Sequence, residues 1–262
     1  MKTIGIVSLK GGVGKTSAVA ALGAALADFG KKILLVDANF SSSNLGLHLN
    51  IIDPETTLHE VLDEAKHIKD AIVKHEKFDV ILPSLFSKKI INPLKLRSKL
   101  KNLKNKYDYA LIDSSPAMND ETLGAMLASD ELFVVTTPDF PTLSNTLKAI
   151  KLAQQRGIKI NGIILNKVYN KNFEIPLADI EKTTEIPILA VIPHDLNAMK
   201  SLFNSVPLTT YKPNSEGSIE YKKLAAALIG EKYKPFNLSN FFHITPKRQE
   251  INREVFYKRV FE

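Results

Sequence analysis

"TIGIVSLKGGVGKTS", residues 3 to 17, joins a short apolar run to a glycine-rich loop and then to the start of an alanine-rich segment. Residues 3–9 have the apolar, β-branched composition of a buried parallel strand. Residues 15–29 have the composition of a helix, and Gly30 is a typical signal for its C-terminal end. A glycine-rich loop between a strand and a helix is the sequence context of a phosphate-binding loop.

The glycines of this loop allow backbone N–H groups to turn inward without obstruction by side chains. The helix that follows adds the partial positive charge of its N-terminus, so both effects favour a bound polyphosphate. Lys15 is expected to reach the β- and γ-phosphates, and the Thr16 hydroxyl is expected to ligate Mg²⁺. The predicted nucleotide-binding residues of the loop are Gly11, Gly12, Val13, Gly14, Lys15, Thr16 and Ser17.

Two features of the loop depart from the simplest phosphate-binding pattern. The strict form G-x-x-x-x-G-K-[ST] requires glycine at position 9, where this chain has Leu9. The loop also carries a second lysine, Lys10, five residues before Lys15. A loop that only holds phosphate needs Lys15 and not Lys10, so Lys10 indicates an additional role.

The composition limits the classes of protein to which the chain can belong. Its 262 residues include no cysteine, which excludes disulfides, thiolate zinc sites and iron–sulfur ligation. A net charge of +7 favours an anionic partner such as nucleotide, DNA or acidic lipid. The sequence shows neither a signal peptide nor a run long enough to span a membrane, so we expect a cytoplasmic protein.

Apolar, strand-like runs alternate with helix-length segments along the chain. They lie at residues 3–9, 32–37, 78–82, 109–113, 131–137, 160–166 and 187–192. This alternation predicts right-handed βαβ crossovers and therefore an α/β fold of three layers, with a mostly parallel, twisted sheet flanked by helices on both faces. We expect one domain over residues 1–235, with ligands bound beyond the carboxyl ends of the strands.

Residues 92–107 are predicted to form a lysine-rich helix. Leu96, Leu100 and Leu103 share the spacing of one helical face and are expected to face the sheet. Five lysines and one arginine lie at positions 95, 97, 99, 101, 104 and 106 of the same segment. This basic face is either simply solvated or a patch for the phosphates of DNA or acidic lipid.

Residues 236–262 form a basic and aromatic extension outside the regular alternation. It contains Phe236, Phe241, Phe242, Phe256, Tyr257 and Phe261 beside Lys247, Arg248, Arg253, Lys258 and Arg259. A membrane-surface helix needs its apolar residues on one face. Those between residues 251 and 261 spread around most of the helix, which makes packing on the chain's own core or on a partner at least as good an interpretation.

Three polar residues end predicted strands beside the loop. Asp113 closes "YALID" and Asp37 closes "LLVD"; aspartates in this context support Mg²⁺ through its water shell, and Asp37 is also placed to hold the attacking water. Asn166 closes "GIILN" and offers a donor and an acceptor that suit the edge of adenine. In isolation each is also explained as a helix cap or turn residue, and the phosphate loop favours the ligand role.

Five motifs, taken together, resemble the MinD/ParA family of ATPases with the deviant Walker A motif. They are "KGGVGKT" (10–16), "LLVDAN…NLGLHL" (34–49), "YALIDSSP" (109–116), "ILNKV" (164–168) and "VIPHD" (191–195). The resemblance extends over about residues 1–230 and implies a P-loop NTPase fold that binds ATP and Mg²⁺, with Pro193 beside the nucleotide. It also implies a switch that is a monomer without ATP and a sandwich dimer around two ATP molecules, reset by slow hydrolysis.

The same resemblance assigns roles in catalysis to Lys10, Lys15, Asp37 and Asn39. Lys10 matches the signature lysine that reaches the partner's nucleotide, where it acts like an arginine finger supplied in trans. The family usually has a second aspartate where this chain has Asn39. Because asparagine holds a water but cannot accept its proton, we expect slow or partner-dependent hydrolysis and a long-lived ATP dimer.

The resemblance leaves three functions open. The first is a MinD-type positioning ATPase, for cell division or a polar structure, attached peripherally to the inner face of the membrane. The second is a ParA-type partition ATPase whose ATP dimer binds DNA non-specifically. The third is a protein-interaction switch that binds ATP and hardly hydrolyses it. An activating protein partner is expected in each case, and the absence of cysteine excludes the relatives that carry iron–sulfur clusters.

Overall fold

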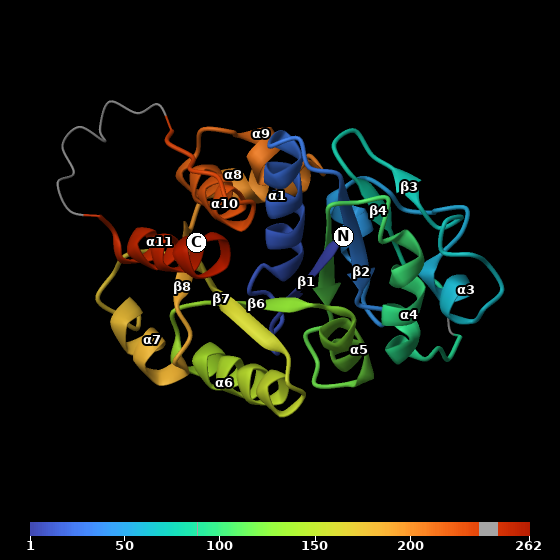
Figure 1. Cartoon of the computed structure of the whole chain (residues 1–262), viewed down its shortest axis with the longest axis horizontal. Helices are drawn as coiled ribbons and strands as arrows, with labels where there is room; N and C mark the ends of the chain where they lie inside the picture. The colour runs from blue at the N-terminus through green and yellow to red at the C-terminus, as the bar shows by residue number, and fades with distance from the viewer. Residues whose placement is uncertain (88, 236–245) are drawn as a thin grey trace.

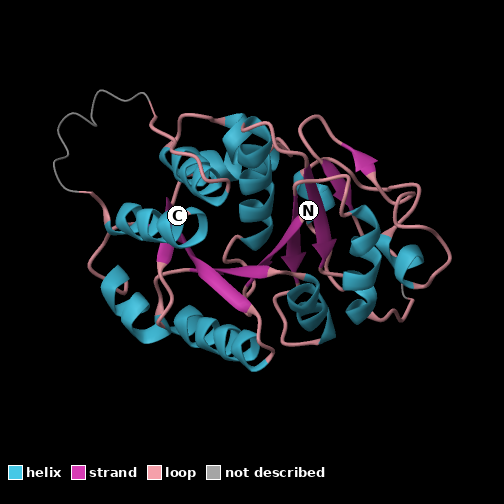
Figure 2. Cartoon of the chain, in the orientation of Figure 1, coloured by secondary structure: helices cyan, strands magenta, loops and turns pink. Residues whose placement is uncertain are grey.

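The structure, a computed structural model, describes residues 1–87, 89–235 and 246–262. These residues build one eight-stranded sheet in the order β3-β4-β2-β5-β1-β6-β7-β8 (Figure 1 and Figure 2). The strands are β1 (Lys2–Val7), β2 (Ile33–Ala38), β3 (Val73–Lys74), β4 (Asp79–Ile81), β5 (Tyr109–Ser114), β6 (Glu131–Thr136), β7 (Lys159–Val168) and β8 (Ile188–Pro193). Every pair of neighbours is parallel except β3 with β4, which confirms the predicted α/β fold.

Helices connect most of the strands. They are α1 (Lys15–Asp28), α2 (Leu45–His48), α3 (Leu58–Leu62), α4 (Leu96–Leu100), α5 (Asp120–Ala128), α6 (Phe140–Gln155), α7 (Leu177–Thr184), α8 (Leu196–Phe203), α9 (Leu208–Tyr211), α10 (Glu216–Leu228) and α11 (Arg248–Phe261), with the 3₁₀ turns η1 (Pro93–Lys95) and η2 (Lys101–Leu103). Among the helices that the structure describes, none is long and apolar enough to cross a membrane.

The sheet is buried on both faces, as its continuous apolar strands require. Successive residues of a strand point to opposite faces, so Ile6 of β1 joins the core under α1 and α10, whereas its neighbour Val7 joins the core with α6. Leu34 and Val36 of β2 pack in a third cluster with residues of α3, α4 and α5. The sheet is therefore the middle one of three layers (Figure 2).

The sheet register brings the carboxyl ends of three strands together. β5 lies between β1 and β2, and Asp113 is paired with Ile6 on one side and with Asp37 on the other. The loop that follows β1 is therefore next to both aspartates. This juxtaposition, which sequence alone suggests only as a general rule for parallel sheets, positions the site.

The lysine-rich segment differs from the single helix predicted over residues 92–107. It is divided into η1, α4 and η2. The three leucines predicted to face the sheet are all buried: Leu96, Leu100 and Leu103. Glu64 accepts ion pairs from Lys95 at 3.0 Å and Lys99 at 3.8 Å, so part of the basic charge is neutralised by the chain itself.

The described part of the C-terminal extension packs on the core through α11. The Phe256 side chain is 2% exposed and joins the cluster under α10. Arg253 donates to the Leu189 carbonyl at 2.8 Å and to the Glu220 carboxylate at 2.9 Å. The predicted aromatic residues Phe236, Phe241 and Phe242 lie outside the described residues.

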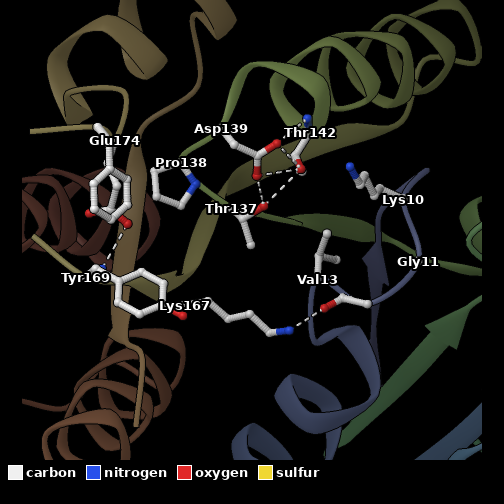
Figure 3. Close-up of a pocket in the computed structure, with 12 residues that line it drawn as sticks. Lys10, Gly11, Val13, Thr137, Pro138, Asp139, Thr142, Lys167, Tyr169 and Glu174 are labelled. Carbon is white, nitrogen blue, oxygen red and sulfur yellow. Dashed lines mark hydrogen bonds between the residues drawn. The ribbon is translucent and has the colours of Figure 1, made fainter. Parts of the chain in front are cut away.

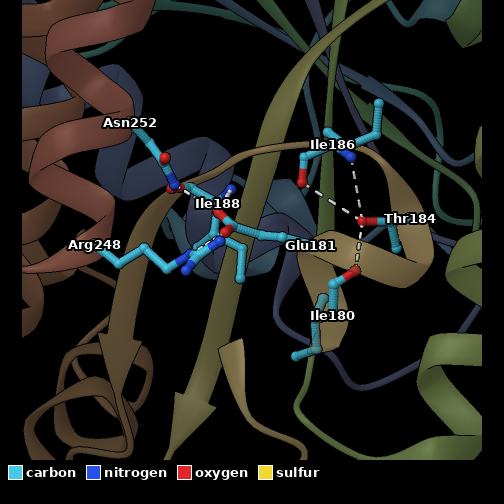
Figure 4. A network of polar contacts seen from close by, with 7 residues as sticks. All are labelled: Ile180, Glu181, Thr184, Ile186, Ile188, Arg248 and Asn252. Atoms are coloured by element: carbon cyan, nitrogen blue, oxygen red, sulfur yellow. Dashed lines mark hydrogen bonds and ion pairs between the residues drawn. The ribbon is translucent and has the colours of Figure 1, made fainter. Parts of the chain in front are cut away.

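The N-terminal half of α11 covers the open edge of β8 (Figure 4). The Glu181 carboxylate of α7 accepts the Ile188 amide at 2.8 Å and also binds the side chains of Arg248 and Asn252. Asn252 in turn donates to the Ile188 carbonyl at 2.8 Å. Side chains therefore satisfy backbone groups of the edge strand that a further strand would otherwise bind.

Candidate nucleotide site

The phosphate loop connects β1 to α1 with backbone geometry that glycine alone adopts easily. Gly12 has φ of 76° and Gly14 has φ of 95°, both in the left-handed region. Gly14 is the N-cap of α1, a helix of 14 residues whose first N–H groups open toward the loop. The turned backbone and the helix N-terminus together form the anion-binding cradle that the sequence predicts.

Two consecutive residues at the end of β7 hold the carbonyls of the loop. Asn166 donates from Nδ2 to the Val13 carbonyl at 2.7 Å. Lys167, which is drawn in Figure 3, donates from Nζ to the Gly12 carbonyl at 2.7 Å. With its carbonyls held on this side, the loop is free to turn its N–H groups the other way. A Cβ at Gly14 would lie 2.2 Å from Asn166 Nδ2, so this close approach also requires glycine.

These contacts add to what the sequence predicts for this strand end. The sequence predicts Asn166 at the adenine edge, whereas its amide nitrogen is bonded to the loop in the structure. Lys167 is not among the predicted site residues, although the motif "ILNKV" (164–168) contains it. Val13 has its side chain in the core, so it is the backbone of this predicted residue that takes part in the loop.

The side chains predicted for Mg²⁺ meet where β5 ends. Thr16 Oγ1 donates to Asp113 Oδ2 at 2.6 Å, and Asp113 Oδ1 is buried with no hydrogen-bond partner among the described residues. Hydroxyl and carboxylate oxygens are the ligands that Mg²⁺ prefers. Among the described residues, no group of three or more His, Cys, Asp or Glu side chains is arranged to hold a metal ion.

Burial shifts the pKa values of Asp113 and of its neighbour Lys15. Desolvation, followed by the nearby Asp37 carboxylate, raises the pKa of Asp113 to about 7, against the lowering effects of Thr16 and Lys15. The Lys15 side chain is 7% exposed, and burial lowers the pKa of its ammonium while Asp113 raises it. An added divalent cation would therefore relieve a buried, partly uncompensated negative charge.

Asp37 is fully buried, and residues that follow it occupy both of its carboxylate oxygens. Its donors are the Asn39 amide at 2.9 Å, the Ser43 hydroxyl at 2.8 Å, the Leu45 amide at 3.1 Å and the Asn44 amide at 3.2 Å. Burial raises the pKa of Asp37, and these four hydrogen bonds lower it. In this arrangement Asp37 organises the loop of residues 39–45 beside the cradle.

Asn39 is buried beside Asp37 and has one free polar atom. Its Nδ2 donates to the Ser42 carbonyl at 2.5 Å, whereas Oδ1 has no partner among the residues described. The free atom is an amide oxygen, which accepts a hydrogen bond from water but does not take up a proton at neutral pH. This geometry fits the predicted weakness of Asn39 as a catalytic base.

A cleft of about 580 Å³ extends from the phosphate loop to the ends of β7 and β8. Its size is in the range of small-molecule sites. The predicted residues that line it are Gly11, Gly12, Gly14, Lys15, Thr16, Ser17, Asn39, Asn166 and Pro193. An apolar end of the cleft, including Ile192, Leu208 and Tyr221, was not predicted and has the character of a site for a planar base.

Lys10 lies on the other side of the loop, at a second hollow of about 300 Å³ (Figure 3). Its neighbours there include Pro138, Asp139 and Tyr169. Within the described residues Lys10 has no ion pair, whereas the Asp139 carboxylate is occupied by Thr137 and Thr142. Burial raises the pKa of Asp139, whereas hydrogen bonds from Thr137 and Thr142 and the nearby charge of Lys10 lower it, so Lys10 acts on this carboxylate without forming an ion pair with it.

Replacing Asp113 is expected to stabilise the chain without nucleotide at alkaline pH. The folded carboxyl has a pKa above its unfolded value, so wild-type stability should fall as pH rises from about 4 to about 7. Asp113→Asn removes this ionisation, still accepts from Thr16, and should raise the free energy of unfolding at pH 8 by about 1–3 kcal/mol. Urea unfolding at pH 5 and pH 8 measures this, with the exposed Asp53→Asn as control, and a destabilised Asp113→Asn at pH 8 would contradict it.

Comparison with known proteins identifies the family of the chain. A family model described as an AAA domain matches residues 1–164. An uncharacterised ATP-binding protein of Methanocaldococcus jannaschii is 35% identical over 233 residues, which cover 88% of each chain. The cell division ATPase MinD of Pyrococcus furiosus has a TM-score of 0.81 at 36% identity, over 86% of this chain and 96% of that one. The septum site-determining protein MinD of Pyrococcus horikoshii, solved with Mg-ADP, has a TM-score of 0.81 at 32% identity, over 93% and 99% of the two chains.

The range matched by the family model contains the loop after β1, the paired strands β2 and β5, and Asn39. The sheet that carries them is shared with solved MinD structures over most of its length. The chain therefore belongs to the MinD/ParA family of P-loop ATPases.

Proposed function

We propose that this ATPase is a switch that dimerises when it binds ATP and Mg²⁺, hydrolyses ATP slowly, and acts in positioning at the inner surface of the membrane. The observation that carries the dimer is Lys10, an unpaired lysine next to a cradle whose own lysine, Lys15, is already in place. A positive charge that the chain's own phosphate site does not need is available for the phosphates of a second site.

The chain's own residues have distinct tasks in this proposal. The loop amides and Lys15 would hold the β- and γ-phosphates, while Thr16 and Asp113 would hold Mg²⁺. The Pyrococcus horikoshii relative, solved with Mg-ADP, supports nucleotide and Mg²⁺ as the ligands. When bound between these residues, Mg²⁺ would supply positive charge beside the phosphates. Asn166 and Pro193 line the base end of the cleft, and Asp37 fixes the loop that carries Asn39.

Hydrolysis is proposed to be slow because Asn39 lacks a carboxylate. Asn39→Asp is expected to raise the single-turnover rate by about 10- to 100-fold, since a positioned base contributes about 10²–10⁴-fold to such reactions. Phosphate release from a saturated enzyme–ATP complex measures the rate.

A neighbouring asparagine provides the matched control for this substitution. Asn44 lies in the same loop and, like Asn39, donates to the Ser42 carbonyl, at 2.9 Å. Asn44→Asp adds the same charge but leaves Asn39 in place, so it should leave the rate within about twofold. An unchanged rate in Asn39→Asp, or brisk wild-type turnover without a partner, would contradict the proposal.

The surface that the dimer binds has two candidates. The MinD relatives favour a membrane, and the alternative is non-specific DNA binding of ParA type, for which the unpaired Lys101 and Lys104 are available among the described residues. Co-sedimentation with acidic liposomes and with duplex DNA, each with ATP, ADP and no nucleotide, separates them. ATP-dependent liposome binding supports the first, whereas ATP-dependent DNA binding that weakens steeply with salt supports the second.

A third outcome of that experiment has its own meaning. If the protein binds neither liposomes nor DNA in any nucleotide state, the switch acts on a protein partner. The long-lived ATP dimer expected from slow hydrolysis at Asn39 would suit this role. An activating partner for hydrolysis is proposed in all three cases, because the chain's own base is weak.

A further inference from the structure

One buried hydroxyl group in the cleft has no hydrogen-bond partner. Tyr221 lies on α10, its side chain is 2% exposed, and it lines the apolar end of the cleft. None of the described residues forms a hydrogen bond with the Tyr221 hydroxyl, and burial alone raises the pKa of this group. Buried tyrosine hydroxyls normally have a partner. Because the surrounding core supplies none, a partner for Tyr221 has to come from the cleft.

The other buried hydroxyl at this end of the cleft is already satisfied. Ser201 lines the cleft, and its hydroxyl donates to the Ala198 carbonyl at 2.9 Å. The remaining side chains around Tyr221 are apolar, and they include those of Ile192 and Leu208. The Tyr221 hydroxyl is therefore the group at this end that is free to recognise a polar atom of a ligand.

The cleft runs from an exposed rim to a buried floor. Met199 and Leu202 of α8 line the rim and are 62% and 47% exposed. Ile192, Leu208 and Tyr221 line the floor and are all buried. A ligand group that reaches this floor leaves water, and a hydrogen bond formed there is stronger than one formed in water.

The floor lies where the base of a bound nucleotide is expected. Thr16, Ser17 and Ala20 of α1 all line the cleft, and α10, which carries Tyr221, packs against α1 (Figure 1). Ala20 is one turn beyond Thr16, or roughly 6 Å along the helix axis. A nucleotide whose phosphates are held at the N-terminus of α1 can therefore extend its base along the helix toward the floor.

We propose that the Tyr221 hydroxyl binds the edge of the nucleotide base and fixes which edge points into the cleft. The proposal rests on the nucleotide site proposed above and adds to it a residue that phosphate and Mg²⁺ binding do not require. A purine edge carries both acceptor nitrogens and donor or acceptor substituents, and a tyrosine hydroxyl both donates and accepts. Apolar walls that contact the faces of the base and one polar group that orients it are typical of small-molecule sites.

This role predicts opposite effects of the hydroxyl on stability and on affinity. Without nucleotide the group is buried and unpaired, so its removal should leave the stability of the chain unchanged or raise it. With nucleotide bound, the same removal deletes a hydrogen bond and should weaken binding. A hydroxyl with only a structural role would lower stability when removed and leave affinity unchanged.

The test is Tyr221→Phe in the full chain, which removes only the oxygen atom. Calorimetric titration should show that the affinity for Mg-ADP falls by about 3- to 10-fold, the net effect of one neutral hydrogen bond. The affinity for pyrophosphate with Mg²⁺ should stay within about twofold, because this probe has no base. The urea midpoint of the chain without nucleotide should stay the same or rise.

Tyr109→Phe provides the matched control. The Tyr109 hydroxyl donates to the Leu228 carbonyl at 3.2 Å, and Tyr109 does not line the cleft. This substitution also removes one oxygen atom, but it breaks a hydrogen bond within the protein. It should lower the urea midpoint and leave the affinities for Mg-ADP and pyrophosphate unchanged.

The outcomes separate this inference from the proposed function. If the wild type binds Mg-ADP and Tyr221→Phe binds it equally well, the base contact is wrong and the proposed function stands. If the wild type binds no nucleotide, both are wrong. Equal losses of Mg-ADP and pyrophosphate affinity would place the effect at the phosphate loop and overturn the base contact. A urea midpoint lowered as far as in Tyr109→Phe would show a structural role and overturn it as well.

Discussion

Gly14→Ala is expected to weaken ATP binding by about 100- to 1,000-fold in a chain that still folds. Gly14 has φ of 95°, where a side chain costs about 1–2 kcal/mol. The added Cβ would also lie 2.2 Å from Asn166 Nδ2, so the loop or the asparagine has to move, and the bond to Val13 is lost at about 1–3 kcal/mol. Without nucleotide, the variant relieves the clash by displacing the loop. Phosphate binding needs the original loop conformation, so the cost appears as a loss of ATP affinity.

Gly30→Ala is the control that shows how much of the effect of Gly14→Ala comes from backbone strain alone. Gly30 has φ of 74°, and a Cβ there would meet nothing within 4 Å. Gly30→Ala should lower stability by about 1 kcal/mol and leave nucleotide affinity unchanged. Titration with a fluorescent ADP derivative measures the affinity of both variants. Wild-type affinity in Gly14→Ala would show that the cradle is not where the phosphates bind.

Lys10→Ala is expected to abolish the ATP dimer while sparing nucleotide binding by the monomer. A charge-assisted hydrogen bond contributes about 1.5–3 kcal/mol, and a two-fold dimer has two of them, so the dimer should weaken by about 100- to 10,000-fold. The monomer should bind ATP within about twofold of wild type, because Lys10 has no ion pair in its own site among the described residues.

Two other lysines provide the comparison for Lys10→Ala. Lys15→Ala removes a buried charge from the cradle and should lose nucleotide binding itself. Lys171→Ala removes an exposed charge from the loop after β7 and should change neither quantity. If Lys10→Ala loses monomer affinity as much as Lys15→Ala does, Lys10 is a local phosphate ligand and the proposed cross-dimer role is wrong.

Much of the fold follows from short-range patterns in the sequence. The alternation of apolar runs with helical segments predicts the parallel sheet, and strand ends differ from prediction by one or two residues, as at 3–9 against Lys2–Val7. β3 was not predicted, because a two-residue strand has no periodicity to detect. The lysine-rich segment has the predicted buried leucines, but it is a short α-helix between two 3₁₀ turns and not one long helix. The spacing of apolar residues indicates which face is buried, and it does not indicate how regular the helix is.

The sequence predicts which residues form the site, but it does not predict most of the contacts between them. The rule that ligands bind at the carboxyl ends of parallel strands places Asp37, Asp113 and Asn166 near the loop, and the sheet register brings the first two side by side. The bonds from Asn166 and Lys167 to the loop span more than 150 residues of sequence, so no local pattern reports them.

The most direct test of the switch is the mass of the wild-type protein in solution with Mg²⁺ and ATP, with ADP, and without nucleotide. Because hydrolysis is proposed to be slow, ATP itself should suffice for the measurement. Light scattering coupled to size exclusion should then give twice the mass of the chain with ATP and the mass of one chain in the other two states. A single chain in all three states, at concentrations where ATP binding is saturated, would contradict the account.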